Sequence, residues 1–146
     1  GNHITEIGDN AFEKCTSLQK IIIPDSTEKI GDNAFQLCES LTDIQLGNSL
    51  KTIGKYAFSE CTALSNGAVI PDSVTELGDY AFNKCASLTS IYYMGAVPKI
   101  EDCNLYGGTP DSLISYYPEG DNSWKSAIKE DGTWYERGTD TWIPKK

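Results

Sequence analysis

The chain has 146 residues, 39% of them hydrophobic, which suits a single domain with a buried core. Its formal net charge is −9, with 12 basic against 21 acidic side chains, so it lacks the basic patch that nucleic-acid phosphates or an anionic membrane surface require. No apolar run approaches the roughly 18 residues of a membrane-spanning helix, and we therefore expect no nucleic-acid partner and no membrane insertion.

One nine-residue pattern recurs four times and decides the predicted fold. It begins with Ile or Leu and then Gly, continues through Ala-Phe, ends with Cys, and is followed by a Leu. The copies are 23, 23 and 24 residues apart and start at Ile7, Ile30, Ile53 and Leu77. Four copies in register indicate a repeat protein whose units stack on one another. Because Ile4 already falls inside a repeat, we expect the sequence to be part of a longer protein.

Each repeat predicts one helical turn and one strand. Residues 9–15 suit a single helical turn capped by Asp9 or Asn10. Residues 18–23 suit a strand that Pro24 ends, and residues 41–46 and 88–93 repeat this pattern. A period of 23 residues leaves no room for a full helix and two loops. The Gly after the first aliphatic residue, such as Gly8, indicates a corner where a side chain would clash or φ is positive.

Stacking the repeats about 4.8 Å apart would bury their apolar sides in one continuous core. The predicted fold class is therefore an α/β repeat solenoid of about five coils, with parallel strands and short helical turns on its convex side. All four Phe residues of the chain occupy one repeat position, and they are expected to form an inward-facing ladder of Phe12, Phe35, Phe58 and Phe82.

A fifth coil follows in degenerate form. Leu105 lies 23 residues after Phe82 and is predicted to replace it, while the Ala and Cys positions fall on Asn104 and Gly108. A strand is predicted at 113–117, ended by Pro118. We expect the solenoid to cover residues 1–118, with this last coil acting as a terminal repeat.

Residues 119–146 are predicted to form a C-terminal capping segment. A short helix is expected near 124–128, and a hairpin with strands near 133–136 and 141–143 around Gly138-Thr139-Asp140. All three Trp residues of the chain lie here. Their favoured role is to cover the open edge of the last coil, and the alternative is glycan binding by exposed faces of Trp124, Trp134 and Trp142.

These repeats resemble the BspA-like leucine-rich repeat family. The stretch Ile21-Ile22-Ile23-Pro24 and residues 70–78 match its Ile-x-Ile-Pro and Val-x-x-Ile-Gly elements, and residues 4–118 carry the likeness. The resemblance implies a right-handed curved solenoid, and a bacterial protein that is secreted or exposed at the cell surface. It also implies a role in adhesion or host contact, without naming a ligand.

The cysteines are predicted to be structural. Four of them share one repeat position and should stack in a column about 4.8 Å apart, beyond the roughly 3.8 Å Cβ separation of a disulfide: Cys15, Cys38, Cys61 and Cys85. A column cannot converge on zinc, and the sequence contains no Cys-x-x-Cys pair. Cys103 lies outside the column and is the best candidate for an exposed thiol, although a buried role is favoured.

The sequence assembles no catalytic set. Its one His, His3, lies near an end of the chain, where nothing is expected to hold it as a catalytic base. Asp9, Asp32 and Asp79 share one position and could bind calcium between coils, but Lys55 interrupts their column and helix capping is favoured. We therefore expect no enzyme activity, no metal and no cofactor.

Alternation along the predicted strands places one set of side chains outward. Its middle column is unusually apolar for a solvent-facing surface and consists of Ile22, Gln45, Val69, Tyr92 and Tyr116. Lys20, Asp43 and Ser90 precede this column on their strands. These eight residues are the candidate binding site for a host or matrix protein. The alternative is that β-branched and aromatic residues simply stack well between neighbouring strands, which would make the chain a structural spacer of a larger surface protein.

Overall fold

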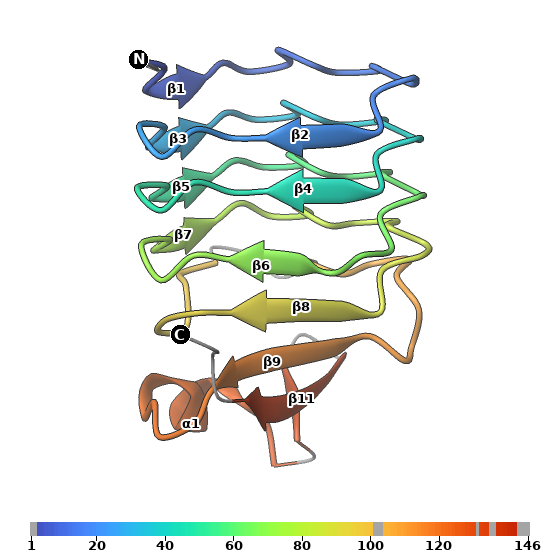
Figure 1. Ribbon diagram of the computed structural model, residues 1–146. Coiled ribbons are helices and arrows are strands. Elements are labelled where there is room, and N and C mark those ends of the chain that lie inside the picture. Colours follow the sequence, from blue (N-terminus) through green and yellow to red (C-terminus); the bar gives the residue numbers. More distant parts are fainter. Residues whose placement is uncertain (1–2, 101–103, 131, 135–136, 143–146) are drawn as a thin grey trace.

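The computed structural model describes residues 3–100, 104–130, 132–134 and 137–142 as one stack of coils with two strands in most turns (Figure 1). One row of two-residue strands consists of β1 (Glu6–Ile7), β3 (Lys29–Ile30), β5 (Thr52–Ile53) and β7 (Glu76–Leu77). The other row consists of β2 (Lys20–Ile22), β4 (Asp43–Gln45), β6 (Ala68–Ile70), β8 (Ser90–Tyr93) and β9 (Ile114–Pro118). The chain then forms α1 (Ser123–Ala127), β10 (Thr133–Trp134) and β11 (Arg137–Trp142).

Every strand from β1 to β9 pairs in parallel with its equivalent in a neighbouring coil, as the repeat predicted. The row of short strands forms a continuous sheet in the order β1-β3-β5-β7. This second sheet was not predicted, because a strand of two residues has too little alternation to be recognised in the sequence. The two rows lie on different sides of the coil (Figure 1), and buried residues of both rows belong to one hydrophobic core.

The predicted helical turn is wrong: residues 9–15 form consecutive turns instead. Alternate N–H groups close turns within the coil, as from Glu13 to the Asn10 carbonyl at 3.1 Å. The intervening ones bond to the next coil, as from Phe12 to the Ala34 carbonyl at 2.8 Å. In a helix these N–H groups would bond to carbonyls of the same helix, and a helix about 10 Å wide cannot stack on its neighbour at a strand spacing of about 4.8 Å. Hydrogen bonding between coils therefore outweighs helix formation.

This turn geometry requires positive φ at two positions in each repeat. The residues concerned are Asn10, Asn33, Tyr56 and Tyr80 at the first position and Lys14, Leu37, Glu60 and Lys84 at the second, with φ between 56° and 60°. Asn adopts this left-handed conformation readily, whereas a bulky side chain is strained in it. Tyr56 donates its N–H to the Asp79 carbonyl of the next coil at 3.0 Å, and its ring stacks on that of Tyr80 with centroids 4.9 Å apart.

The corner glycines are required by close approach between coils, the first of the two predicted reasons. None of them is among the glycines with positive φ. A Cβ on Gly54 would instead lie 2.6 Å from the backbone nitrogen of Asp32 in the preceding coil. Gly8, in the first coil, has no neighbour within 4 Å of that position. The recurrence of Gly at this repeat position thus reflects how closely the coils stack.

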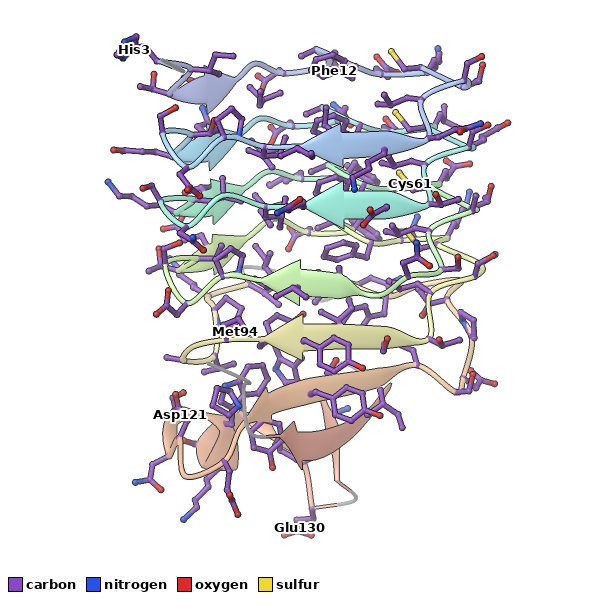
Figure 2. All side chains as sticks on the ribbon, in the orientation of Figure 1. His3, Phe12, Cys61, Met94, Asp121 and Glu130 are labelled. Carbon is purple, nitrogen blue, oxygen red and sulfur yellow. The ribbon has the colours of Figure 1, made fainter. Side chains whose placement is uncertain are left out.

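The predicted phenylalanine ladder is confirmed and runs through the core. Successive ring centroids are 5.2, 5.2 and 5.6 Å apart, and the planes differ by at most 8°. Phe35, Phe58 and Phe82 are fully buried, whereas Phe12 is only partly buried because it belongs to the first coil (Figure 2). Stacking along the coil axis makes each interior ring contact two others.

In the fifth coil the predicted alignment is wrong by one residue. Phe82 donates its N–H to the Leu105 carbonyl, as the earlier Phe residues donate to Ala34, Ala57 and Ala81. Leu105 therefore occupies the Ala position, and the buried Tyr106 occupies the Phe position. Thr109 then replaces Cys, and its hydroxyl bonds to the Tyr106 carbonyl at 2.6 Å. The register of the fifth coil follows a spacing of 24 residues, which its degenerate sequence concealed.

The C-terminal segment packs against the last coils. The helix lies where it was predicted, but the predicted hairpin turn at 138–140 is wrong, since those residues lie inside β11. That strand pairs antiparallel with β10 and parallel with β9, so it extends the sheet by two strands. Trp124 and Trp134 are 0% and 4% exposed and pack together at a centroid distance of 4.8 Å.

Candidate interaction surface

The outward side of the longer strands forms the candidate surface, and its register follows the predicted column. Ile22 pairs with Gln45 across β2 and β4, and Tyr92 lies between Val69 and Tyr116 across β6, β8 and β9. Ile22 is 58% exposed and Val69 is 48% exposed, which are high values for aliphatic side chains on strands. Whether this surface binds a partner stays a prediction.

The first two coils carry a charged pair beside the column. Lys20 and Asp43 face each other across β2 and β4, and their Nζ and Oδ2 atoms are 3.1 Å apart. Both side chains remain partly exposed, so solvent screens the pair. In β8 and β9 the equivalent positions are Ser90 and Ile114, which pair without charge. This row of the face is thus charged at one end of the stack and neutral at the other.

The last two strands carry an aromatic pair. The rings of Tyr92 and Tyr116 stack with centroids 4.8 Å apart and planes 10° apart, as in-register parallel strands require. Both side chains are half-buried. Since Val69 pairs with Tyr92 from the other side, the three residues form a continuous apolar strip along the stack.

An interruption divides the face between β4 and β6. No ladder joins these two strands: β2 and β4 form a sheet of their own, and β6 is the edge of the next sheet. The sequence between them carries an additional residue in the stretch Ser65-Asn66-Gly67, and Gly67 adopts a φ of 73°. Ala68 also replaces the Ile that fills this core position in the coils on either side, Ile44 and Ile91.

A depression of about 330 Å³ lies at this interruption. Its apolar walls come from Val69, Pro71, Met94 and Leu46, and its polar rim from Asp43, Gln45 and Asn48. Two of the predicted column residues, Gln45 and Val69, therefore line opposite sides of it. This hollow is named the β4–β6 depression. The sequence signalled it only through the additional residue before β6.

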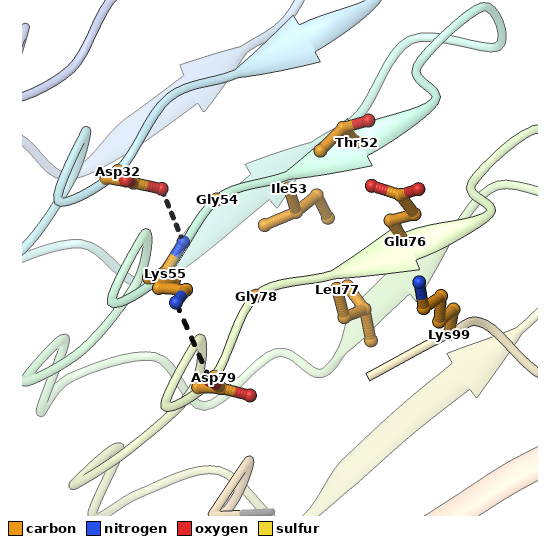
Figure 3. A pocket seen from close by; sticks show the side chains of 10 residues that line it. All are labelled: Asp32, Thr52, Ile53, Gly54, Lys55, Glu76, Leu77, Gly78, Asp79 and Lys99. Atoms are coloured by element: carbon orange, nitrogen blue, oxygen red, sulfur yellow. Dashed lines mark hydrogen bonds and ion pairs between the residues drawn. The ribbon is translucent and has the colours of Figure 1, made fainter. Parts of the chain in front are cut away.

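A second depression of about 190 Å³ lies on the sheet of short strands (Figure 3). Lys55 donates its backbone N–H to Asp32 Oδ1 at 2.8 Å, and its ammonium lies 3.9 Å from Asp79 Oδ2. The sequence marked this place through Lys55, which interrupts the column of Asp residues. Because Lys55 contacts the coil before it and the coil after it, these two interactions are best explained as structural contacts between coils.

The Asp column binds backbone rather than capping a helix. Asp9 Oδ1 accepts the N–H of Asp32 at 2.7 Å, as Asp32 accepts that of Lys55. For Asp9 and Asp32 the predicted capping role is therefore wrong, since each of these two carboxylates bonds to the backbone of the next coil instead of to its own turn. Within the described residues, no group of three His, Cys, Asp or Glu side chains is arranged to hold a metal ion.

The cysteine column consists of free thiols that also link the coils. The Sγ atoms of Cys38, Cys61 and Cys85 donate to Phe carbonyls of the preceding coils at 3.1, 3.2 and 3.1 Å. Burial raises the pKa of Cys38 to about 11 and that of Cys85 to about 12. A thiol that stays protonated at neutral pH is a poor nucleophile. Cys103, the predicted exposed thiol, lies outside the described residues.

The alternative role of the Trp residues, glycan binding by exposed faces, is wrong for Trp124 and Trp134. Both are buried, and the indole N–H of Trp124 donates to the Gly95 carbonyl at 3.1 Å. In the described parts of the chain, no helix has the length and hydrophobicity needed to cross a membrane.

Comparison with known proteins agrees with this architecture. The family model described as the BspA type leucine rich repeat region matches residues 1–109 in six copies. No curated protein matches the sequence.

Three similar solved structures are all bacterial leucine-rich repeat proteins. The T. pallidum leucine rich repeat protein is 29% identical, with a TM-score of 0.65 over 77% of this chain and 51% of that chain. A protein from Bacteroides capillosus is 36% identical, with a TM-score of 0.56 over 62% of this chain and 64% of that one. A leucine rich cell surface protein from Faecalibacterium prausnitzii is 28% identical, with a TM-score of 0.75 over 86% of this chain and 32% of that one. The chain thus spans less than two thirds of each relative.

Proposed function

Because the chain belongs to the BspA-type leucine-rich repeat family, we propose that it is a protein-interaction module whose outward strand face binds a host or extracellular-matrix protein. The observation that supports this most directly is the exposure of Ile22 and Val69, at 58% and 48%, in line with the Tyr92–Tyr116 stack. Solenoids commonly bind partners through such extended faces. An apolar strip on a strand face gains free energy when a partner covers it.

The proposed setting is the bacterial surface or the extracellular space. One structural neighbour is named as a cell surface protein, and it covers 86% of this chain. The module would act by binding alone, in an adhesion role. This is consistent with the structural use of its thiols, which are buried and donate to main-chain carbonyls.

A purely structural spacer is the competing function. The stacking of Tyr92 on Tyr116 favours it, because contact between neighbouring strands is enough to explain two aromatic residues in register. The exposed Ile22 and Val69 make no such stack and favour the interaction module.

Substitution on the face separates the two functions. We would measure binding of the chain and of a Val69→Asp, Tyr92→Ala, Tyr116→Ala variant to a panel of immobilised matrix proteins by surface plasmon resonance. A Lys51→Ala, Glu28→Ala variant is the control, since this exposed pair directly precedes β5 and β3 in the row of short strands. Loss of binding in the first variant alone supports the module. Equal binding by both folded variants would contradict it, and binding by neither the chain nor its variants would favour the spacer.

A further inference from the structure

The β4–β6 depression is the place where the outward face departs from a flat sheet. Its volume of about 330 Å³ is near the lower end of the roughly 300–1,000 Å³ of ligand pockets, so it suits one or two side chains. Val69, Pro71 and Met94 are among its apolar lining residues, and Met94 is half-exposed (Figure 2). An aliphatic side chain entering here would meet apolar atoms on several sides.

The charged residues next to the depression are mostly acidic. Asp43 lines it, and the exposed Asp25 and Asp72 adjoin its lining, since Asp25 Oδ1 accepts the N–H of Asn48 at 2.9 Å and Asp72 follows Pro71 in the chain. The strands β4, β6, β8 and β9 contain no Lys, Arg or His. Lys20 on β2 is the neighbouring cation and already pairs with Asp43. The surface around the depression is therefore complementary to a basic segment rather than to an acidic one.

We propose that the β4–β6 depression binds an aliphatic side chain of an extended, basic peptide segment in the protein partner. This inference rests on the proposed function and names the chemistry of the segment that the face recognises. An extended segment carries residues i and i+2 on the same side, roughly 6.8 Å apart. A Leu, Ile or Met seated between Gln45 and Val69 thus brings a neighbouring Lys or Arg toward the exposed Asp72, which follows Pro71 in the lining.

One property of the chain makes the site directly observable. Met94 is its only methionine, so methyl-¹³C-methionine labelling gives a single methyl resonance that reports on the depression. The probes are linear peptides of twelve residues, selected from a random display library on the full chain. We expect the selected peptides to carry an aliphatic residue beside Lys or Arg, and to shift the Met94 methyl signal at saturation.

Peptide variants test the two recognised features separately. Replacing the aliphatic residue with Ala should weaken binding about tenfold or more. Replacing the basic residues with Glu should abolish the Met94 shift at low ionic strength. Selected peptides that are acidic, that bind without moving the Met94 signal, or that tolerate both changes would overturn the proposal. A library that yields no binder would overturn it as well.

Matched variants of the chain place the binding at the depression. Val69→Lys replaces an apolar lining residue with a positive charge, whereas Ile4→Lys makes the same change on a similarly exposed aliphatic residue outside the lining and outside the outward face. We expect Val69→Lys to weaken the selected peptides about tenfold or more and Ile4→Lys to leave them within about twofold. If Val69→Lys does not fold, as judged by circular dichroism, Gln45→Lys on the opposite wall replaces it.

Failure of the peptide site can be distinguished from failure of the proposed function. If matrix binding maps to the face while peptides ignore the depression, the interaction module stands and the present inference fails. If peptides bind at Met94 while the face variant retains matrix binding, the depression is a peptide site and the proposed adhesion surface is wrong.

Discussion

The first two coils and the last three use the same outward face in different ways. Across β2 and β4 the repeat spacing is 23 residues, the strands pair, and the charges of Lys20 and Asp43 neutralise each other. Past the interruption the strands β6, β8 and β9 form a separate sheet with Tyr92 and Tyr116 stacked on it. Where the spacing of 23 residues is kept, the charged side chains of the face pair with each other. Where an additional residue changes the spacing, apolar surface is left for other contacts.

Both depressions lie where the repeat is altered. The larger one follows the additional residue before β6, and the smaller one surrounds Lys55, which stands in the column of Asp residues. The phenylalanine ladder nevertheless passes through both places, with centroid distances of 5.2 to 5.6 Å throughout. The two halves thus differ at the surface while they share one interior.

The largest expected effect tests that shared interior. Phe58→Ala, at the interruption, should lower the free energy of unfolding by about 3–5 kcal/mol, because Phe58 is fully buried and stacks on two rings. Phe12→Ala should cost clearly less, since Phe12 is partly exposed and stacks on one ring. Urea unfolding followed by fluorescence and circular dichroism measures both. Two separate transitions in the parent chain would show that its halves fold independently.

Substitution of a corner glycine should lower the free energy of unfolding by a similar amount in the two halves. A Cβ on Gly31 would overlap Asp9, and one on Gly78 would overlap Lys55 in the coil before it. We expect Gly31→Ala and Gly78→Ala each to cost about 1–3 kcal/mol through overpacking, measured by thermal unfolding. Gly8→Ala is the matched control, because no atom lies within 4 Å of its Cβ position. A large loss in Gly8→Ala, or none in Gly78→Ala, would contradict the close-approach explanation.

Sequence periodicity predicted the stack because its signal is repeated and long-range. Four copies of Gly, Ala, Phe and Cys fixed the parallel strands, the ladder and the thiol column. The helical turn failed because residues 9–15 have helix-compatible composition, while their hydrogen bonds go to a neighbouring coil. Local propensity carries no information about that neighbour, and only the stacking distance excludes the helix.

The sequence predicted which residues of the strands face outward, but it did not predict the depression between β4 and β6. Alternation of side chains along each strand identified Ile22, Gln45 and Val69 as outward residues. The interruption between β4 and β6 depends on how one additional residue is absorbed, through the positive φ of Gly67. In the fifth coil a shift of one residue moved the aromatic position from Leu105 to Tyr106, since the loss of Ala and Cys removed the markers that fix alignment.

The thiols should contribute equally to the pH dependence of both halves. Burial raises the pKa of Cys38 and Cys85 in the folded chain to about 11 and about 12, so the unfolded chain loses these protons first as the pH rises. The contribution of each thiol to the free energy of unfolding is therefore fully present below about pH 8.5 and is lost as the pH rises toward the pKa of the folded chain. Between about pH 9 and 10 we expect a loss of roughly 1 kcal/mol per thiol. Urea unfolding at pH 8, 9 and 10 measures this slope. Cys38→Ala and Cys85→Ala should each reduce it by one thiol's share, and an unchanged slope in both variants would contradict the assignment.

The smallest effects distinguish the surface chemistry of the two halves. A double-mutant cycle on Lys20 and Asp43 should give a coupling of about 0.2–1 kcal/mol at low salt, because both side chains are partly exposed. Added salt at about 1 M shortens the screening length to roughly 3 Å and should remove most of it. A cycle on Tyr92 and Tyr116 should give about 0.5–1.5 kcal/mol that persists in salt, because ring stacking depends on contact area and quadrupoles rather than on net charge. Equal salt sensitivity in the two cycles would mean that the outward face is held together by one kind of interaction from end to end, and that the interruption separates two segments of similar chemistry.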